Sequence, residues 1–292
     1  MTLIEIREIE DENSPVLQFY TEQNETQLKH YYEPHGGLFI AETEQVILRA
    51  LGAGYIPVSF LAEKRYLDKL PDIMGCMEEP EAADLPVPVY TAPMEILIRI
   101  TGYHLTKGLL CLMKRRPLPS IDELCRDASR LAVLEKVTNP TNIGAVFRSA
   151  AALGMDGVLL SADCCDPLYR RAVRVSLGTV FQIPWTIMPS GRKEEGSLQP
   201  YWPSEGMKLL HGYGFKTAAM ALSERAVSIE EPSIWQEEKL AVILGNEAYG
   251  LSGETLLCCD REVCIPMQHG VDSLNVAAAG AVVFWQLRKR TG

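Results

Sequence analysis

The chain has 292 residues, of which 47% are hydrophobic and 23% charged, and its formal net charge at pH 7 is −10. This length and hydrophobic content can supply buried cores for one large or two medium domains, which argues against a disordered chain. The acidic balance argues against nucleic-acid binding over the whole surface, because neutralising phosphates requires clustered lysine and arginine.

The N-terminal segment "MTLIEIREIEDENSP" lacks a basic region followed by an apolar one, so we expect no signal peptide. The longest apolar run, 276–287, is shorter than the roughly 20 residues that cross a bilayer. Eight cysteines without a CxxC pattern indicate reduced thiols and no metal site. These features predict a soluble, cytoplasmic protein without a membrane segment.

Residues 38–60, "LFIAETEQVILRALGAGYIPVSF", predict a strand, an amphipathic helix and a second strand. Gly52 and Gly54 follow this helix rather than open one, so they indicate a helix end and not a nucleotide-binding loop. The segments "VPVY" and "GLLCLMK" predict further strands, up to the basic, proline-containing segment "KRRPLPS". We therefore place a first α/β domain at 1–116 and a linker at 117–127.

From residue 128 onward, expected strands and helices alternate regularly. Such alternation predicts a largely parallel sheet with helices on both faces, in a second α/β domain at 128–292. The expected strands are 131–137, 157–162, 183–188, 215–222, 240–245 and 262–267. The expected helices are 142–154, 170–180, one near 204–212, and a final helix after the third motif described below.

Ligands of parallel α/β sheets bind outside the carboxyl ends of the strands, so the segments that follow strands are candidate sites. The first motif, "NPTNIGAVFRSAAALG" at 139–154, follows the first strand of the second domain. We expect Asn142 to cap the new helix, with Arg148 nearly two turns further along among small residues. Such an arginine either pairs with a surface carboxylate or contacts a partner or phosphate.

The second motif is "LGNEAYGLS" at 244–252. Gly245 and Gly250 permit sharp turns and a close approach of backbone to a ligand, and Glu247 places a carboxylate between them. A loop with two glycines is a weak signal when it stands alone.

The third motif is "IPMQHGVDSLNVA" at 265–277, directly before an apolar helix. Asp272, Ser273 and Asn275 can cap that helix, but capping explains one polar residue and not the whole polar group. The sequence lacks GxxxxGK[ST], GxSxG, HExxH and a helix-opening GxGxxG, which weakens P-loop, hydrolase, zinc-protease and ordinary Rossmann interpretations.

Taken together and in this order, the three motifs resemble those of the SpoU (TrmH-type) branch of the SPOUT RNA methyltransferases, over roughly 128–292. The segment "DPLYRRAVRVSLGTVF" is similar to the one found between the first and second motifs. The resemblance implies a C-terminal SPOUT α/β domain with a deep trefoil knot, which binds S-adenosylmethionine, and methylation of a ribose 2′-hydroxyl of tRNA or rRNA. It also implies a homodimer through this domain, in which an arginine of one subunit reaches the active site of the other.

By the same resemblance, the catalytic positions are Arg148, Asn142, Glu247, Ser273 and Asn275. The cofactor-binding positions are Leu244, Gly245, Asn246, Gly250, Ile265, Met267 and Leu274. The sequence departs from the family pattern at one place, where His269 occupies the usual position of a glycine and Gly270 follows it. We interpret Arg148 as a group that orients the 3′-phosphate and stabilises negative charge, because a guanidinium does not lose its proton in proteins.

Residues 1–116 resemble the L30e-like substrate-binding domain of several rRNA-modifying members, which favours rRNA over tRNA. The chain's local basic clusters are candidate RNA-binding sites, namely Lys114, Arg115 and Arg116, and Arg170, Arg171 and Arg174. Two alternatives stay open at this point. One is a knotted RNA- or ribosome-binding protein without catalytic activity, and the other is a Rossmann-like enzyme that acts on a small molecule.

Overall fold

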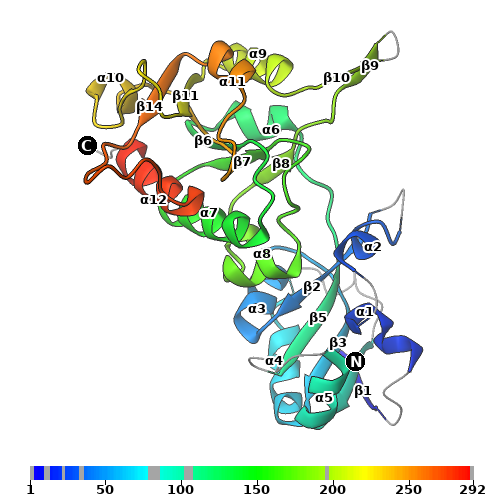
Figure 1. Cartoon of the computed structure of the whole chain (residues 1–292). Helices are drawn as coiled ribbons and strands as arrows, with labels where there is room; N and C mark the ends of the chain where they lie inside the picture. The colour runs from blue at the N-terminus through cyan, green and yellow to red at the C-terminus, as the bar shows by residue number, and fades with distance from the viewer. Residues whose placement is uncertain are drawn as a thin grey trace. The chain divides into compact units, whose positions relative to one another are not determined.

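The structure is a computed structural model that describes residues 3–9, 14–21, 24–32, 36–77, 86–101, 108–194 and 197–289. The chain divides into two compact units (Figure 1). The first comprises Met1–Pro117 and Leu168–Gln182, and the second comprises Leu118–Pro167 and Ile183–Gly292. The segment 168–182 lies in the range predicted for the second domain, but it packs with the first unit.

The first unit is built on a five-stranded mixed sheet in the order β1-β4-β3-β5-β2. Strand β4 pairs in parallel with β1 and β3, whereas β5 is antiparallel to β3 and β2. The strands are β1 (Ile4–Glu8), β2 (Leu38–Glu42), β3 (Pro57–Glu63), β4 (Val87–Ala92) and β5 (Leu109–Lys114). The helices are α1 (Gln18–Thr21), α2 (Glu25–Lys29), α3 (Glu44–Gly52), α4 (Leu70–Met74), α5 (Met94–Thr101) and α8 (Arg170–Val175).

The strand–helix–strand prediction for 38–60 is confirmed by β2, α3 and β3. Helix α3 buries Val46, Ile47, Ala50 and Leu51, whose spacing places them on one face of the helix. The chain leaves the helix through Gly54, whose φ of 74° lies in the left-handed region that favours glycine.

The segment 168–182 differs from the single helix predicted at 170–180. Helix α8 ends at Val175, because the next turn contains Leu177 and Gly178 with φ of 53° and 79°, and a 3₁₀ turn follows at Thr179–Phe181. The Arg49 guanidinium of α3 donates a hydrogen bond to the Leu177 carbonyl at 2.6 Å. The left-handed turn is therefore fixed by contacts within the first unit.

The second unit contains a seven-stranded sheet in the order β12-β14-β11-β13-β6-β7-β8. All of its pairings are parallel, which confirms the predicted α/β class and parallel sheet. The strands are β6 (Arg130–Leu134), β7 (Gly157–Leu160), β8 (Trp185–Ile187), β11 (Lys216–Met220), β12 (Val227–Ser228), β13 (Leu240–Leu244) and β14 (Arg261–Cys264). A separate antiparallel hairpin joins β9 (Arg192–Glu194) and β10 (Ser197–Gln199).

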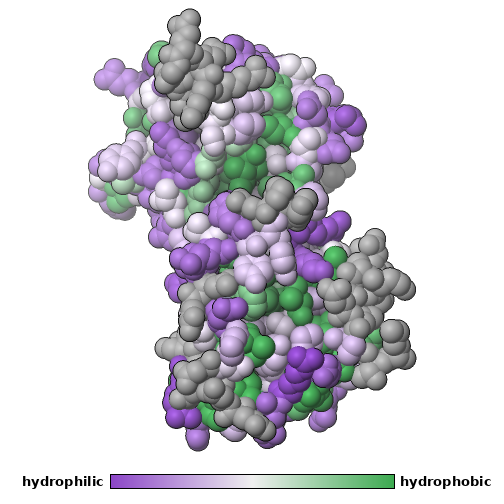
Figure 2. Space-filling view, turned by 90° about the vertical axis from the view of Figure 1, so that its right-hand side faces the viewer, coloured by the Kyte–Doolittle hydropathy of each residue, from purple (hydrophilic) through white to green (hydrophobic). Residues whose placement is uncertain are grey.

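Helices cover both faces of this sheet. Figure 1 shows α7 (Pro140–Ala152) and α12 (Val276–Leu287) side by side on one face. The other helices are α6 (Ile121–Arg126), α9 (Ser204–Gly212), α10 (Pro232–Trp235) and α11 (Gly253–Cys258). Apolar residues of α6 and α9 pack with those of the central strands in one buried cluster, including Leu124, Leu131, Met207 and Leu210. On the face shown in Figure 2, hydrophobic residues lie in small groups between hydrophilic ones.

Two helix starts fix the positions of the first and third motifs. Helix α7 begins at Pro140, and its cap is Asn139, whose side chain accepts from the Thr141 N–H. The prediction that Asn142 caps this helix is therefore wrong. Proline suits the first helical position, so the helix begins at Pro140, two residues before Asn142. Helix α12 is capped by Asn275, whose side chain accepts from the Ala277 N–H. Asn142 is left with a side chain free for other contacts.

Candidate active site

A cavity of about 640 Å³ opens at the carboxyl ends of β11, β13 and β14. Its wall includes the last residue of each strand, Met220, Leu244 and Cys264. The strands are neighbours in the parallel sheet, so the loops that follow them meet at the same edge, as ligand sites of this architecture require. The volume falls within the range of roughly 300–1,000 Å³ that small-molecule sites occupy.

The second and third motifs form most of the wall of this cavity. Every position to which the resemblance gives a cofactor-binding role lines it: Leu244, Gly245, Asn246, Gly250, Ile265, Met267 and Leu274. Of the positions with a catalytic role, Glu247, Ser273 and Asn275 line it as well. Asn142 and Arg148 are not part of the wall.

A chain of hydrogen bonds joins one residue from each motif. The Asn275 amide donates to the Asn142 Oδ1 at 3.1 Å, and the Asn142 amide donates to the Glu247 Oε1 at 2.5 Å. Asn142 is buried, whereas Glu247 and Asn275 are exposed at the cavity. The first motif therefore orients the polar groups of the other two, although it lies outside the cavity wall.

The second motif is folded tightly around its own asparagine. The Asn246 Oδ1 accepts from the backbone N–H groups of Ala248 and Tyr249 at 2.8 and 3.1 Å. The backbones of Asn246 and Gly250 exchange two hydrogen bonds. A Cβ on Gly245 would lie 2.5 Å from the Gly250 carbonyl carbon, so only glycine fits where the loop closes on itself.

The third motif contains the departure noted at His269. His269 has φ of 57° and Gly270 has φ of 70°, so two consecutive residues take left-handed conformations. A glycine at the first position would adopt this conformation without strain, whereas histidine is less favourable there. Histidine thus takes, at this position, a conformation that a glycine would adopt more easily.

Arg148 lies on α7 with its side chain exposed. Its guanidinium forms no hydrogen bond or ion pair with any other residue that the structure describes. Pairing with a surface carboxylate, the structural alternative for this residue, is not seen among those residues. The guanidinium can therefore bind an external anionic group.

Both predicted RNA-binding clusters lie in the first unit, and their members differ in exposure and in ion pairing. Arg170 and Arg174 approach the carboxylate of Glu42, which is 2% exposed, at 3.4 and 3.6 Å. Arg171 and Arg116 are exposed. Ion pairing with a buried carboxylate favours a structural role for Arg170, whose side chain is 18% exposed.

The members of the first cluster make further contacts within the unit. The Arg115 Nε donates to the Leu38 carbonyl at 3.1 Å. The Arg116 guanidinium lies 5.9 Å from the centroid of the Tyr55 ring and donates to the Ala53 carbonyl. Lys114 is half-buried at the end of β5. The cluster thus borders the end of α3 and the start of β2.

Some cavity residues were not predicted from the sequence. Met220 ends β11, and together with Ala221 and Leu222 after it forms one part of the wall. Tyr249, which is 90% exposed, lines the cavity as well. The segment after β11 has no glycine or polar motif, so the strand order alone reveals its place. Because β11 lies between β13 and β14, its carboxyl end must border the same cavity.

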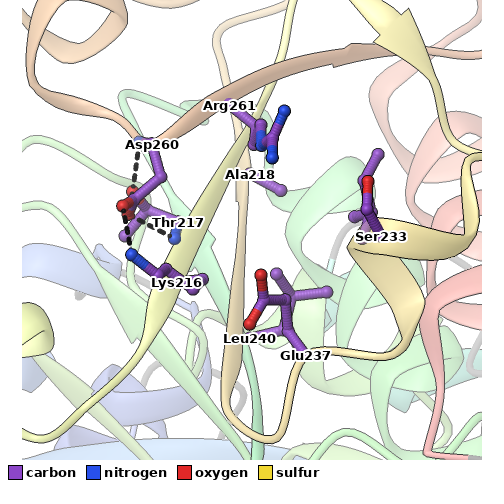
Figure 3. A pocket seen from close by; sticks show the side chains of 9 residues that line it. Lys216, Thr217, Ala218, Ser233, Glu237, Leu240, Asp260 and Arg261 are labelled. Atoms are coloured by element: carbon purple, nitrogen blue, oxygen red, sulfur yellow. Dashed lines mark hydrogen bonds and ion pairs between the residues drawn. The ribbon is translucent and has the colours of Figure 1, made fainter.

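A second, smaller cavity of about 240 Å³ borders the start of β11, β13 and β14. Figure 3 shows Asp260 joined by dashed lines to Thr217 and Lys216, whereas Glu237 and Arg261 lie apart from them. The Asp260 carboxylate accepts from the Thr217 N–H and hydroxyl and from the Lys216 ammonium, at 2.9 to 3.0 Å. The His211 ring nitrogen lies 2.9 Å from the same carboxylate. This cluster ties β11 to the turn before β14.

The Asp260 cluster predicts a pH-dependent contribution to stability. Partial burial raises the pKa of Asp260, but hydrogen bonds from Thr217, Lys216 and His211 outweigh it and lower the pKa from 3.8 to about 2. Because the folded pKa is depressed, the ionised carboxylate stabilises the fold above pH about 4, and this contribution is lost as pH falls toward 2. We expect the stability difference between the wild type and Asp260→Asn to shrink as the pH falls below about 4.

Urea unfolding at each pH measures this difference. The exposed Asp127, in the same unit, provides Asp127→Asn as a control for charge removal. A difference between wild type and Asp260→Asn that stays the same from pH 7 down to pH 3 would contradict the assignment.

None of the described helices has the length and apolar character that a bilayer crossing requires. Within the described ranges, no three histidine, cysteine or acidic residues gather as they would around a metal ion.

Comparison with known proteins gives a consistent assignment. The sequence profile of the SpoU rRNA Methylase family matches residues 129–285. A protein of Mycobacterium bovis named as a tRNA/rRNA methyltransferase is 33% identical over 290 residues, which are 99% of this chain and 93% of that protein. The 23S rRNA (guanosine(2553)-2′-O)-methyltransferase RlmP of Bacillus subtilis is 30% identical over 167 residues, 57% of this chain and 61% of that protein.

The fold agrees with solved structures. The AdoMet-bound rRNA methyltransferase from Sinorhizobium meliloti matches with a TM-score of 0.76 over 97% of both chains, at 17% identity. The match extends over both units of the chain, and the chain therefore shares the α/β fold of that structure. The profile match over more than half of the chain and the relative at 33% identity establish that the chain belongs to the SpoU rRNA methylase family.

Proposed function

We propose that this RNA methyltransferase of the SpoU family transfers a methyl group to a ribose 2′-hydroxyl, in rRNA rather than tRNA. The observation that carries the proposal is the hydrogen-bonded chain Asn275–Asn142–Glu247, which joins the three motifs beside a cavity of the right size. RlmP, a relative that matches over more than half of this chain, is named as a ribose 2′-O-methyltransferase of 23S rRNA.

The methyl donor of the SpoU family is S-adenosylmethionine, and the cavity suits it. Its wall combines apolar side chains such as Ile265 and Leu274 with the backbone of a tightly folded loop around Gly245. Backbone N–H and C=O groups can bind the adenine and amino-acid groups, while the apolar side chains enclose the rest. When bound, S-adenosylmethionine supplies the methyl group.

The residues of the chain act on the acceptor. A ribose hydroxyl is a poor nucleophile until its proton is lost or its developing negative charge is stabilised. The Arg148 guanidinium can bind the 3′-phosphate next to the acceptor ribose in a bidentate way. It can also stabilise the negative charge that develops on the 2′-oxygen, while the guanidinium itself stays protonated. The proton passes to Glu247 or to the phosphate, and Asn142 keeps the Glu247 carboxylate in place.

We further propose that the chain acts as a homodimer through the second unit, with Arg148 serving the cavity of the partner subunit. Arg148 does not line the cavity of its own chain, which supports this arrangement. The outer face of α12 exposes Val282 and Trp285 at 41% and 56%. Exposed apolar side chains on one helix face are typical of an interface between proteins. We also propose that the second and third motifs form the knot within each chain.

Sedimentation should detect the interface. We expect the wild type to be a dimer and the double variant Val282→Glu/Trp285→Glu to be a monomer, because the charges would be buried without partners in the interface. Leu257→Glu changes a side chain that is 79% exposed on α11, and it should stay a dimer. A dimeric double variant would contradict this interface.

For the first unit we propose an L30e-like RNA-binding role, with Arg116, Arg171 and Lys114 as contacts and Arg170 as a structural residue. The sheet of this unit and the ion pair between Arg170 and Glu42 support that division. The preference for rRNA rests on this domain and on RlmP, a relative that acts on rRNA.

The test is methyl incorporation from labelled S-adenosylmethionine into total RNA taken from cells that lack the protein. We expect label in rRNA and not in tRNA. Label in tRNA alone would contradict the proposed substrate. RNA binding without incorporation would support the alternative, a knotted RNA-binding protein without catalytic activity.

A further inference from the structure

A buried carboxylate lies behind the second motif, outside the cavity wall. Glu135 follows β6 and is 1% exposed. Its Oε1 accepts from the Ser252 N–H at 2.8 Å, and its Oε2 accepts from the Trp202 indole N–H at 2.8 Å and from the Thr255 hydroxyl. No lysine or arginine among the described residues pairs with it. Three neutral donors thus satisfy this carboxylate.

Two of these donors fix the end of the second motif. Ser252 is the last residue of the motif and the N-cap of α11, where its side chain accepts from the Thr255 N–H. Since Glu135 accepts from both Ser252 and Thr255, it fixes the point at which the loop becomes helix. A loop attached there cannot move away from the sheet without breaking hydrogen bonds to a buried carboxylate, which is costly.

The residue after Glu135 fixes the start of the same motif. The carbonyl of Lys136 accepts from the Asn246 side chain at 2.8 Å, and Lys136 has φ of 54°, a conformation unfavourable for a residue with a Cβ. Strained backbone persists where the surrounding structure requires it, most often near functional sites. Glu135 and Lys136, which follow β6, thus anchor both ends of the second motif, which forms part of the cavity wall.

We propose that Glu135 is a positioning residue for S-adenosylmethionine binding. By accepting from Ser252 and Thr255, it keeps the second motif in the shape that forms the cavity wall. It does not touch the reacting atoms. This inference rests on the proposed function, in so far as that function assigns the cofactor to this cavity.

The test is the affinity for S-adenosylmethionine without RNA, measured by titration calorimetry on the full chain. In Glu135→Gln, one of the two acceptor atoms becomes an amide nitrogen, so a buried donor loses its acceptor. We expect the dissociation constant to rise about tenfold, since an unmade buried hydrogen bond changes an equilibrium by that order. Thermal unfolding of the same samples separates this loss from a general loss of stability.

A second change should restore the affinity. In the glutamine variant the amide carbonyl can still accept from Ser252, while the amide nitrogen donates to the Thr255 hydroxyl and faces the Trp202 N–H. Trp202→Phe removes that conflicting N–H. We therefore expect the double variant Glu135→Gln/Trp202→Phe to bind S-adenosylmethionine more tightly than Glu135→Gln. Damage to packing alone predicts the reverse, because the two substitutions would then add.

Two further variants complete the design. Thr255→Val keeps the carboxylate and removes one donor, so it should also weaken binding, and it serves if Glu135→Gln does not fold. Glu230→Gln makes the same chemical change at an exposed position and should bind as the wild type does. Unchanged affinity in both Glu135→Gln and Thr255→Val, with a wild type that binds, would overturn this proposal alone. A wild type that does not bind would overturn the cavity assignment and this proposal together.

Discussion

Replacing Arg148 with alanine should lower the rate of methyl transfer by roughly 10²–10³-fold, as does the loss of a group that stabilises transition-state charge. The affinity for S-adenosylmethionine should stay the same, because Arg148 does not line the cavity of its own chain. Single-turnover rates and calorimetric titration of the same protein measure the two quantities.

Arg148→Lys tests whether the fork matters or only the charge. Lysine keeps the positive charge but cannot bind a phosphate in a bidentate way. We therefore expect a rate of methyl transfer between those of the wild type and Arg148→Ala. Near-normal turnover of the lysine variant would contradict the bidentate role.

Replacing Gly245 with alanine should abolish measurable S-adenosylmethionine binding. The new Cβ would lie 2.5 Å from the backbone of Gly250, so the second motif would have to open where it closes on itself. Gly250→Ala is the matched control in the same loop: nothing lies within 4 Å of its Cβ, although φ is 68°. Its cost is strain of roughly 1–2 kcal/mol, so binding should weaken by about tenfold and not be lost.

Titration calorimetry and circular dichroism of both glycine variants check this expectation. Equal affinities for Gly245→Ala and Gly250→Ala would contradict the account of how the second motif closes.

Arg148→Ala and Gly245→Ala, combined in one dimer, test whether active sites are shared between subunits. Arg148→Ala has an intact cavity, and Gly245→Ala has an intact arginine. If Arg148 acts on the partner's cavity, dimers that contain one chain of each kind have one complete site. Refolding the two variants together should then yield activity that neither has alone, whereas an arginine that acts within its own chain predicts none.

Local patterns predicted much of the fold. The segment 38–60 and the buried strand β13 have strong periodic or apolar signals, and the elements formed as expected. The helix predicted at 170–180 was wrong in its second half, since Leu177 carries no signal for the left-handed turn that Arg49 stabilises from elsewhere in the chain. The cap of α7 was missed for a different reason, because Pro140 is a local signal for the first helical position and favours Asn139 over Asn142 as the cap.

The candidate site shows a similar division. Polar residues in motifs, such as Glu247 and Asn275, stand out in the sequence because they follow apolar strands. Leu222 does not, since it is an ordinary apolar residue, and Glu135 also follows an apolar strand but belongs to none of the three motifs. Their roles depend on strand order and on contacts between distant segments, which only the folded chain brings together.

The central claim is that the methyl group is placed on a ribose. The most direct measurement is mass spectrometry of nucleosides from rRNA that has been incubated with the protein and S-adenosylmethionine with an isotopically labelled methyl group. Cleavage of the glycosidic bond separates base from sugar. We expect label on the ribose of one nucleotide, appearing far more slowly with Arg148→Ala than with the wild type. Label on a base, or none in RNA, would contradict ribose methylation.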